Sequence, residues 1–282
     1  MCDTIEAVAT LPGSGKKVGM DTPLLTQRHP SILQITLNRP DAYNALNLDM
    51  MQVLAETLSS AAVDPSINGI VLTGNGNAFC AGGDLKWISQ QTEEAGSVLY
   101  RLAPEFHLSI IEIRRMAKPV VAAVNGIAAG GGFSLALACD FRVMAESAVF
   151  RQAYTSSGLS IDGGGSFALP RLVGLARAME IMAFDHPISA SQALEWGLAT
   201  RVTPDAEVLP SALAMLDELT RSSLQSFAWS KKLMNDSFHH SLEEQLELER
   251  QGISDCAAHA DGQEGIRAFV EKRRPTFQGQ RP

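Results

Sequence analysis

Two glycine-rich stretches are the parts of this sequence whose residue types and spacing could do chemistry. The first, GNGNAFCAGGD, occupies residues 74–84, and the second, NGIAAGGGFS, occupies residues 125–134. In the second stretch, Gly130, Gly131 and Gly132 precede the apolar run FSLALA, so these glycines fall at or just before a predicted helix start. A helix start carries free backbone N–H donors and the positive end of the helix dipole, and glycine lets a ligand oxygen approach closely. This stretch therefore predicts a place that holds an anion.

Both stretches follow predicted buried strands. Residues 67–73 (INGIVLT) and 119–124 (PVVAAV) are short apolar runs of the kind found in buried strands, and we expect the second to be central in its sheet. Ligands of open parallel sheets bind outside the carboxyl ends of the strands. The two glycine-rich stretches should therefore share one edge, where a backbone N–H from each could bind one oxygen. Such a pair of donors stabilises an enolate or a tetrahedral oxyanion.

Glycine triplets have other uses, of which the simplest is to let a strand and a helix pack closely. A phosphate-binding loop is excluded because no Gly-Lys-Ser/Thr follows residues 130–132, and these glycines do not fit the G-x-G-x-x-G spacing of dinucleotide-binding proteins. The segment GSGKK at 13–17 also lacks the final hydroxyl residue. From the residues alone, close packing and anion binding both stay open for the triplet.

The elements that must position these stretches alternate between strand and helix. The predicted strands are residues 31–38, which should be half-exposed, 67–73, 119–124 and 140–146, and the predicted helices are residues 47–58 and 92–117, with a break or kink at Pro104. The segment from Phe150 to Gly165 reads as irregular. This alternation is typical of an α/β fold with a parallel sheet. Residues 204–282 show amphipathic helices only, so we place a boundary near residue 203.

Composition excludes several classes of protein. With 45% hydrophobic and 19% charged residues, the chain of 282 residues is an ordinary globular protein, and its net charge of −8 argues against general nucleic-acid binding. Its apolar runs are too short to span a bilayer, and residues 1–22 contain no apolar signal core, so we expect a flexible lead-in and a cytoplasmic protein. Translation could begin at Met1 or at Met20. The four cysteines lack metal-ligand spacing, and we expect no metal.

Three motifs in order, FCAGGDL, AAVNGIAAGGGFSLALACD and SIDGGGSFALPRLVG, resemble the crotonase superfamily of enoyl-CoA hydratases and isomerases over roughly residues 24–279. The resemblance implies a core of ββα units in a spiral over residues 23–203 that binds an acyl-CoA. It also implies a C-terminal helical trimerisation region over residues 204–282, giving homotrimers or hexamers. Coenzyme A would enter as part of the thioester substrate, with no tightly bound cofactor.

The same resemblance assigns roles to particular residues. The backbone N–H groups of Gly83 and Gly131 would bind the thioester oxygen. Contacts with the coenzyme A portion would come from Ala42, Asn44, Ala45, Leu46, Cys80, Ala81, Asp84 and Leu85, and from Lys272 and Phe277 in the tail KRRPTFQG, often across a subunit boundary. For the tail, simple compensation of a helix dipole by basic residues is the competing explanation.

The catalytic positions depart from the family pattern. Typical hydratases carry one glutamate two residues after the glycine triplet and a second after the following strand, whereas this chain has Ser134 and Tyr154. Neither side chain can act as a carboxylate base, so hydration by the usual pair is not expected. We expect Ser134, Tyr154 and Ile161 to line the substrate pocket, together with Leu159 and Phe167.

A carboxylate does occur at Asp162, in the segment SIDGGGS, at a position resembling the catalytic aspartate of the phenylacetate-pathway isomerase branch. The competing role is to cap the following helix, because an aspartate before Gly-Gly-Gly-Ser fits an N-cap. His107 lies on a predicted helix at the spacing at which related dehalogenases carry a histidine base. Without that resemblance, His107 would be a packed or surface residue.

The favoured hypothesis is double-bond isomerisation of a 3-enoyl-CoA, in which Asp162 moves a proton from C2 to C4. One alternative is hydration of a 2-enoyl-CoA, with water activated by Asp162 or His107. A second is thioester hydrolysis or dehalogenation with Asp162 as nucleophile. A third, from another class, is a non-catalytic acyl-CoA-binding protein.

Overall fold

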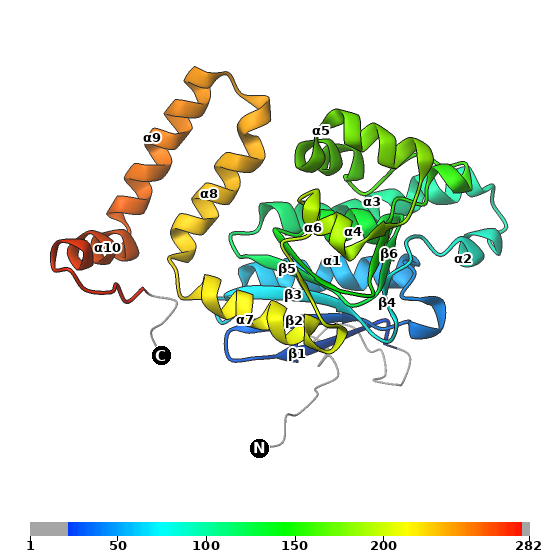
Figure 1. Cartoon of the computed structure of the whole chain (residues 1–282), viewed down its shortest axis with the longest axis horizontal. Helices are drawn as coiled ribbons and strands as arrows, with labels where there is room; N and C mark the ends of the chain where they lie inside the picture. The colour runs from blue at the N-terminus through cyan, green and yellow to red at the C-terminus, as the bar shows by residue number, and fades with distance from the viewer. Residues whose placement is uncertain (1–21, 278–282) are drawn as a thin grey trace, which may run out of the picture.

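The computed structural model describes residues 22–277, which contain two β-sheets and the helices that pack on them (Figure 1). The lead-in expected over residues 1–22 and the two candidate start residues, Met1 and Met20, lie outside the described residues except for Thr22. Within residues 22–277, no helix combines the length and the apolar character needed to cross a bilayer. The cytoplasmic location stays a prediction.

The larger sheet has six strands. Their order is β1 (Leu24–Arg28), β2 (Ile32–Leu37), β3 (Gly69–Gly74), β5 (Val120–Val124), β7 (Phe141–Ala145) and β10 (Arg201–Thr203). β1 is antiparallel to β2, and each of the other neighbouring pairs is parallel. All five residues of β5 are buried, and the strand lies between β3 and β7. The prediction that residues 119–124 form a central strand is confirmed.

After each of the strands β3, β5 and β7, the chain enters a smaller sheet. It consists of β4 (Ala78–Cys80), β6 (Ile127–Ala129), β8 (Val149–Arg151) and β9 (Ile188–Ser189), in that order. The chain passes from β3 to β4, from β5 to β6 and from β7 to β8, and helices follow each pair. The result is a spiral of ββα units, as expected. The sequence did not predict β4 and β6 as strands, because each is three residues long and stands beside glycines.

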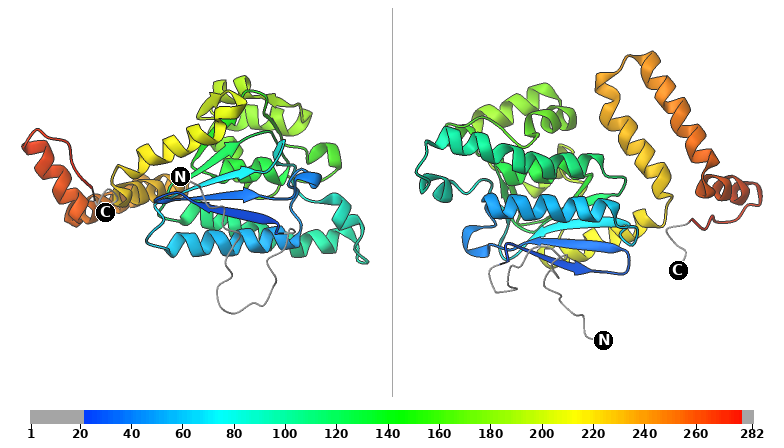
Figure 2. Two further views of the ribbon diagram at one scale, coloured as in Figure 1. Left: turned by 90° about the horizontal axis from the view of Figure 1, so that it is seen from below. Right: turned by 180° about the vertical axis from the view of Figure 1, so that it is seen from behind.

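Ten α-helices complete the described part of the chain. They are α1 (Leu48–Val63), α2 (Leu85–Ser89), α3 (Ala95–Arg115), α4 (Gly131–Ala138), α5 (Gly165–Phe184), α6 (Ala190–Glu195), α7 (Val208–Thr220), α8 (Leu224–Asp236), α9 (Leu242–Ala258) and α10 (Ala260–Val270). After β10, the described residues form helices and no strand, as predicted. α7 packs on β3, β5 and β7, whereas α8, α9 and α10 project from the body of the molecule (Figures 1 and 2).

Two local predictions were wrong. β2 is almost wholly buried rather than half-exposed, because β1 covers its outer edge and Gln34 is buried through hydrogen bonds with His29 and Thr36. A break or a kink was predicted at Pro104, and the break is absent, because α3 is continuous from residue 95 to residue 115. The missing N–H of Pro104 removes a bond to the carbonyl of Tyr100, a residue on the exposed side of the helix, where water can take its place.

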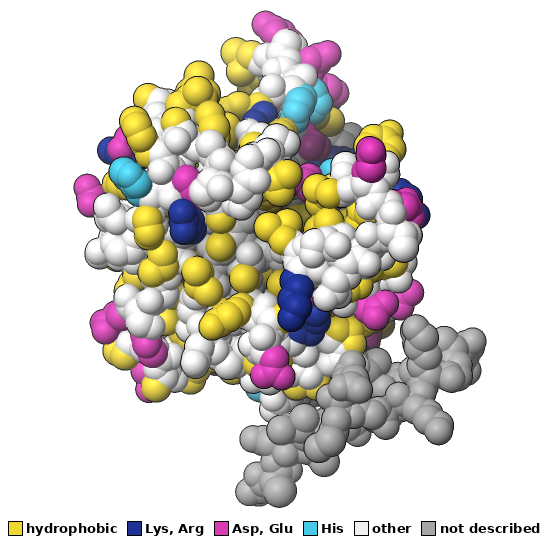
Figure 3. All heavy atoms as spheres, turned by 90° about the vertical axis from the view of Figure 1, so that its right-hand side faces the viewer, with side chains coloured by type: hydrophobic (Ala, Val, Ile, Leu, Met, Phe, Trp, Pro, Cys, Tyr) yellow, Lys and Arg dark blue, Asp and Glu magenta, His cyan; other side chains and the backbone are white. Residues whose placement is uncertain are grey.

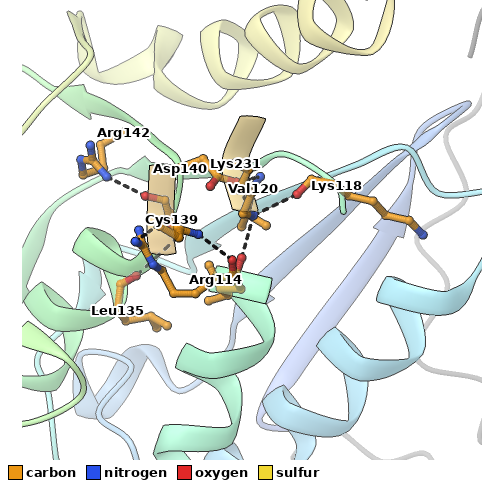
Figure 4. Close-up of polar contacts among 10 residues, drawn as sticks. Arg114, Lys118, Val120, Leu135, Cys139, Asp140, Arg142 and Lys231 are labelled. Carbon is orange, nitrogen blue, oxygen red and sulfur yellow. Dashed lines mark hydrogen bonds and ion pairs between the residues drawn. The ribbon is translucent and has the colours of Figure 1, made fainter. Parts of the chain in front are cut away.

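A buried ion pair joins the projecting helices to the core. Lys231 of α8 donates to Asp140 Oδ2 at 2.8 Å and to the carbonyl oxygen of Ile113, at the end of α3, at 2.7 Å. The same Asp140 oxygen accepts from the N–H of Val120 at 2.8 Å (Figure 4). Burial lowers the pKa of Lys231 and raises the pKa of Asp140, although the opposite charge of each residue favours the ionised form of the other. The pair therefore fixes α8 to the start of β5, the strand that leads to the glycine triplet.

Candidate active site

A cavity of about 390 Å³ lies where the two glycine-rich stretches meet. It is lined by Leu46, Met51, Ala81, Gly83, Leu85, Ile88, Leu99, Leu102, Ala103, Phe106, Gly130, Gly131, Ala153, Tyr154, Ser157, Leu159, Ser160, Ile161 and Asp162. Figure 3 shows the side of the molecule that carries α2, and hydrophobic side chains are numerous across its centre. Among the described residues that line the cavity, Asp162 alone is charged. The cavity therefore suits an apolar group held next to one carboxylate.

The backbone N–H of Gly83 points away from Leu46, the residue with which Gly83 forms a bridge. Leu46 forms a parallel bridge with Gly83, in which the N–H of Leu46 donates to Gly82 O at 2.7 Å and the N–H of Asp84 donates to Leu46 O at 3.0 Å. Because successive peptide groups of an extended segment point to opposite sides, the N–H of Gly83 faces away from Leu46. A Cβ added at Gly83 would meet no atom within 4 Å, so the space beside it is open.

Gly131 is the first residue of α4, and Gly130 is its N-cap residue. Its N–H is one of the first four of the helix, which have no partner within the helix. The two glycine-rich stretches touch at this point, because a Cβ added at Gly82 would lie 3.0 Å from the nitrogen of Gly131. The prediction that both stretches share one edge is confirmed. Gly132 has the other role considered for the triplet, since its added Cβ would overlap the carbonyl oxygen of Cys80 at 2.0 Å.

Asp162 begins a tight turn instead of capping a helix. The N–H of Gly165 donates to Asp162 O at 3.2 Å, and both central residues, Gly163 and Gly164, have positive φ angles of 61° and 73°. The N-cap of α5 is Gly164, with no side-chain cap hydrogen bond. The capping role considered for Asp162 is therefore wrong, and its carboxylate is available for other contacts. A Cβ added at Gly163 would lie 2.2 Å from the ring of Phe106, so this turn requires glycine there.

The carboxylate of Asp162 contacts His107 of α3. His107 Nε2 and Asp162 Oδ1 are 2.6 Å apart, and the two side chains are 44% and 41% exposed. Asp162 lines the cavity, whereas His107 is not among the lining residues and reaches the carboxylate from outside. The structure thus brings together the two titratable residues that the sequence singled out 55 positions apart.

Ser134 and Tyr154, which stand where typical hydratases carry glutamates, both face the main chain of Asp162. Ser134 is buried, and its hydroxyl donates to Asp162 O at 2.6 Å. The Tyr154 hydroxyl is 3.4 Å from the same oxygen. Burial raises the pKa of Tyr154 to about 12, so the phenol stays protonated at neutral pH. Tyr154 lines the cavity as expected, but Ser134 is not among the lining residues and lies behind the Asp162 turn.

The segment assigned to coenzyme A is held by side chains that have structural roles. Asn44 is fully buried, and its amide donates to the carbonyls of Asn75 and Ala78 at 2.9 and 2.8 Å. Asp84 accepts from the N–H of Trp87 and caps α2. Any contact of Asn44 or Asp84 with a ligand must therefore use the main chain. Ala42 and Ala45 belong to the same segment, and of this set Leu46, Ala81 and Leu85 line the cavity.

Arg39 is a residue whose importance the sequence did not indicate. Its guanidinium contacts Asp84 Oδ2 at 2.8 Å and donates to Ala45 O at 2.5 Å. It therefore ties the segment before α1 to the segment that carries Gly83. The only signal in the sequence was its place at the start of a turn-rich loop.

Some predicted residues lie elsewhere. Lys272 and Phe277 follow α10 and do not line this cavity, and the Phe277 ring is 3.6 Å from a Cβ added at Gly265. Phe167 was expected in the substrate pocket but lines a different cavity, where it stacks on His239. Cys80 does not line the cavity, and its buried side chain has a thiol pKa raised by burial to about 12. Leu159 and Ile161 line the cavity as predicted.

Residues 22–277 contain no group of three or more His, Cys, Asp or Glu side chains placed to hold a metal ion.

The spiral of ββα units with a glycine-lined cavity at its strand ends defines an α/β protein of the crotonase fold. The chain belongs to the enoyl-CoA hydratase/isomerase family, whose family model matches residues 27–280.

Individual relatives carry both isomerase and hydratase names. The chain is 36% identical over 264 residues to the 1,2-epoxyphenylacetyl-CoA isomerase of Escherichia coli, covering 91% of this chain and 98% of that protein. It is 40% identical over 245 residues to a probable enoyl-CoA hydratase of Rhodobacter capsulatus, covering 87% and 93%. The crystal structure of an enoyl-CoA hydratase from Polaromonas sp. JS666 matches with a TM-score of 0.86 and 38% identity, covering 90% of this chain and 99% of that one.

Proposed function

We propose that this enzyme moves a double bond in an enoyl-CoA thioester from the 3,4 to the 2,3 position, with Asp162 as its single acid and base. The observation that carries the proposal is that the cavity holds one carboxylate, Asp162, and is bordered by Gly83 and Gly131. An isomerase needs one group that takes a proton and returns it, whereas the hydratases that this chain resembles use two carboxylates.

The chemistry follows from these positions. Asp162 takes a proton from C2, and the electrons of the broken C–H bond move through the thioester carbonyl to its oxygen, giving a dienolate. The N–H groups of Gly83 and Gly131 bind that oxygen, and the positive end of α4 favours the negative charge. Asp162 then delivers the proton to C4, the electrons return, and the double bond becomes conjugated with the thioester. Atoms and charge balance without water or any other reactant.

Hydrolysis or dehalogenation is the second candidate function, favoured by the contact between His107 and Asp162. In this reaction Asp162 would attack the substrate, and His107 would activate water against the covalent intermediate. The contact supports isomerisation at least as well, because His107 bonds the carboxylate itself from outside the cavity, where it orients the base. We therefore place this reaction second.

The cavity lining also favours an apolar acyl group, aliphatic or ring-derived. An acyl chain ending in a second carboxylate, as in the substrate named for the 2,3-dehydroadipyl-CoA hydratase of Escherichia coli, would enter a lining that offers no Lys, Arg or His among the described residues. It would also lie near the negative charge of Asp162. Burying an unpaired carboxylate is strongly unfavourable. A 3-enoyl-CoA with an apolar chain should therefore be turned over in preference to its dicarboxylate analogue.

A panel of thioesters distinguishes the candidate reactions. With a 3-enoyl-CoA, we expect the absorbance of the conjugated thioester to appear, and with crotonyl-CoA we expect no loss of that absorbance. Loss of absorbance from crotonyl-CoA would instead show hydration. An aspartyl ester at Asp162, detected by mass spectrometry after a rapid quench, would support the hydrolytic reaction. Tight binding of every ester with no turnover would indicate a non-catalytic binding protein.

We also propose that the chain self-associates as a trimer or a hexamer through its C-terminal helices. The support is a set of exposed apolar side chains on the projecting helices: Leu242, Leu246, Ile253, Ile266, Phe269 and Val270. Exposed apolar surface of this kind marks an interaction site. Native mass spectrometry gives the number of chains directly, and a monomer at micromolar concentration would contradict this proposal.

A further inference from the structure

We infer that Ser134 is a positioning residue for the reaction, acting through the main-chain carbonyl of Asp162. This inference rests on the proposed function of Asp162 as the acid and base. Ser134 does not line the cavity, so it acts on the substrate only through the turn that it holds.

The contact is a short hydrogen bond whose donor residue is buried. The Ser134 hydroxyl lies 2.6 Å from Asp162 O, and Ser134 is 1% exposed. The donor is itself fixed, because Ser134 is in the first turn of α4 and its N–H bonds the carbonyl of Gly130 at 3.1 Å. A short bond from a rigid helix to one main-chain atom leaves that atom little freedom.

The turn needs such a bond because its own residues constrain it weakly. Gly163 and Gly164 provide no side chains, and glycine is the residue with the greatest backbone freedom. Phe106 and Ile110 of α3 pack against these glycines from one side, and His107 of the same helix bonds the carboxylate. Ser134 supplies the contact from α4. Asp162 is thus held at its carboxylate by one helix and at its carbonyl by another.

Helix α4 carries two parts of the site within one turn. Gly131 is its first residue, and Ser134 follows three positions later. The N–H that would bind the thioester oxygen and the hydroxyl that holds Asp162 therefore belong to one rigid body. This arrangement fixes the position of the base relative to the oxyanion, and the rate of proton transfer depends steeply on that position. Gly165 also packs closely against this hydroxyl, since a Cβ added at Gly165 would lie 2.7 Å from Ser134 Oγ.

Tyr154 provides an internal comparison. Its hydroxyl lies 3.4 Å from the carbonyl oxygen of Asp162, which is too long for a strong hydrogen bond. Its pKa is raised by burial, so it offers a neutral donor only. Removal of the hydroxyl from Tyr154 should therefore affect turnover much less than removal of the hydroxyl from Ser134.

The test compares Ser134→Ala with two control variants. We expect Ser134→Ala to lower kcat by about 10- to 100-fold with KM changed less than about twofold, because a small displacement of a reacting group has effects of this size. Tyr154→Phe should lower kcat by less than about fivefold, as expected for loss of two long, weak contacts, with Asp162 O at 3.4 Å and with Ser134 Oγ at 3.5 Å. Ser109→Ala removes a buried hydroxyl that has no hydrogen-bond partner within the described residues and should leave kcat unchanged.

A double variant separates positioning from a purely structural role. If Ser134 acts through Asp162, adding Ser134→Ala to Asp162→Asn should cause no further loss of kcat, whereas independent effects would multiply. Wild-type turnover by folded Ser134→Ala overturns the inference, and so does a multiplied loss in the double variant. Should the alanine variant not fold, Ser134→Cys keeps a weak donor, and its kcat should fall below wild type; wild-type turnover there also overturns the inference. Full activity of Asp162→Asn alone would instead refute the proposed function.

Discussion

Gly163→Ala and Gly158→Ala form a matched pair that tests the packing of the Asp162 turn. Both glycines have positive φ angles, 61° and 68°, so alanine should cost about 1 kcal/mol in backbone strain at either position. They differ in their surroundings. An added Cβ at Gly163 would lie 2.2 Å from the Phe106 ring, whereas one at Gly158 would meet no atom within 4 Å.

The difference between the two variants isolates the steric part. Phe106 is 3% exposed and lines the cavity, so it cannot swing into solvent to make room. Overpacking of a buried site typically costs about 1–3 kcal/mol. We therefore expect Gly163→Ala to lower the free energy of unfolding by about 2–4 kcal/mol and Gly158→Ala by about 1 kcal/mol.

Urea unfolding monitored by circular dichroism, at one fixed protein concentration, gives both values. Turnover of a 3-enoyl-CoA gives the functional consequence, and we expect a large loss of kcat for Gly163→Ala only, because relief of the overlap must move Phe106 or Asp162. Equal destabilisation and equal activity in the two variants would refute the packing described for this turn.

Three further substitutions or treatments have defined outcomes. Lys231→Met leaves the Asp140 carboxylate buried without its cation and should lower the free energy of unfolding, measured by chemical denaturation, by about 3–5 kcal/mol. Adding Asp140→Leu should recover most of that loss, and no recovery would contradict the role of the ion pair. Asn44→Asp replaces two donated hydrogen bonds by repulsion between the carboxylate and two carbonyls, so thermal unfolding should show a free energy of unfolding lower by at least about 1–3 kcal/mol. An unchanged melting temperature would contradict the structural role of Asn44. Iodoacetamide at pH 8 should label the partly exposed Cys256 before Cys80, whose thiol pKa is raised by burial to about 12; peptide mapping that finds Cys80 labelled first in the native protein would show that the site opens.

The sequence predicted best those features that depend on neighbouring residues. The apolar run before Asn125 and the glycines after it predict a buried strand followed by a helix start, and β5 and α4 are found there. β4 and β6 escaped prediction because their hydrogen-bond partners are supplied by chain segments far away, and three residues carry no readable period. Local patterns therefore predicted the four inner strands of the larger sheet, β2, β3, β5 and β7, but not its edge strands β1 and β10 or the strands of the smaller sheet.

The candidate site divides in the same way. The sequence could place the two glycine-rich stretches at one sheet edge, because each follows a predicted buried strand, and the resemblance to the crotonase superfamily then assigned Gly83 and Gly131 as donors. The contact of His107 with Asp162 and that of Ser134 with the same residue join segments 55 and 28 positions apart, so no local pattern could predict them. The N-cap considered as the competing role for Asp162 is not formed, because Gly163 and Gly164 both have positive φ angles and the helix starts at Gly165.

The most direct measurement is the turnover of a 3-enoyl-CoA by Asp162→Asn, which keeps the shape of the side chain and removes the base. Since general acid–base catalysis contributes about 10²- to 10⁴-fold, we expect kcat to fall by at least about 10²-fold while KM stays close to that of the wild type. Turnover within a few-fold of the wild-type value, in a variant with unchanged circular dichroism, would contradict the assignment of Asp162 as the group that moves the proton.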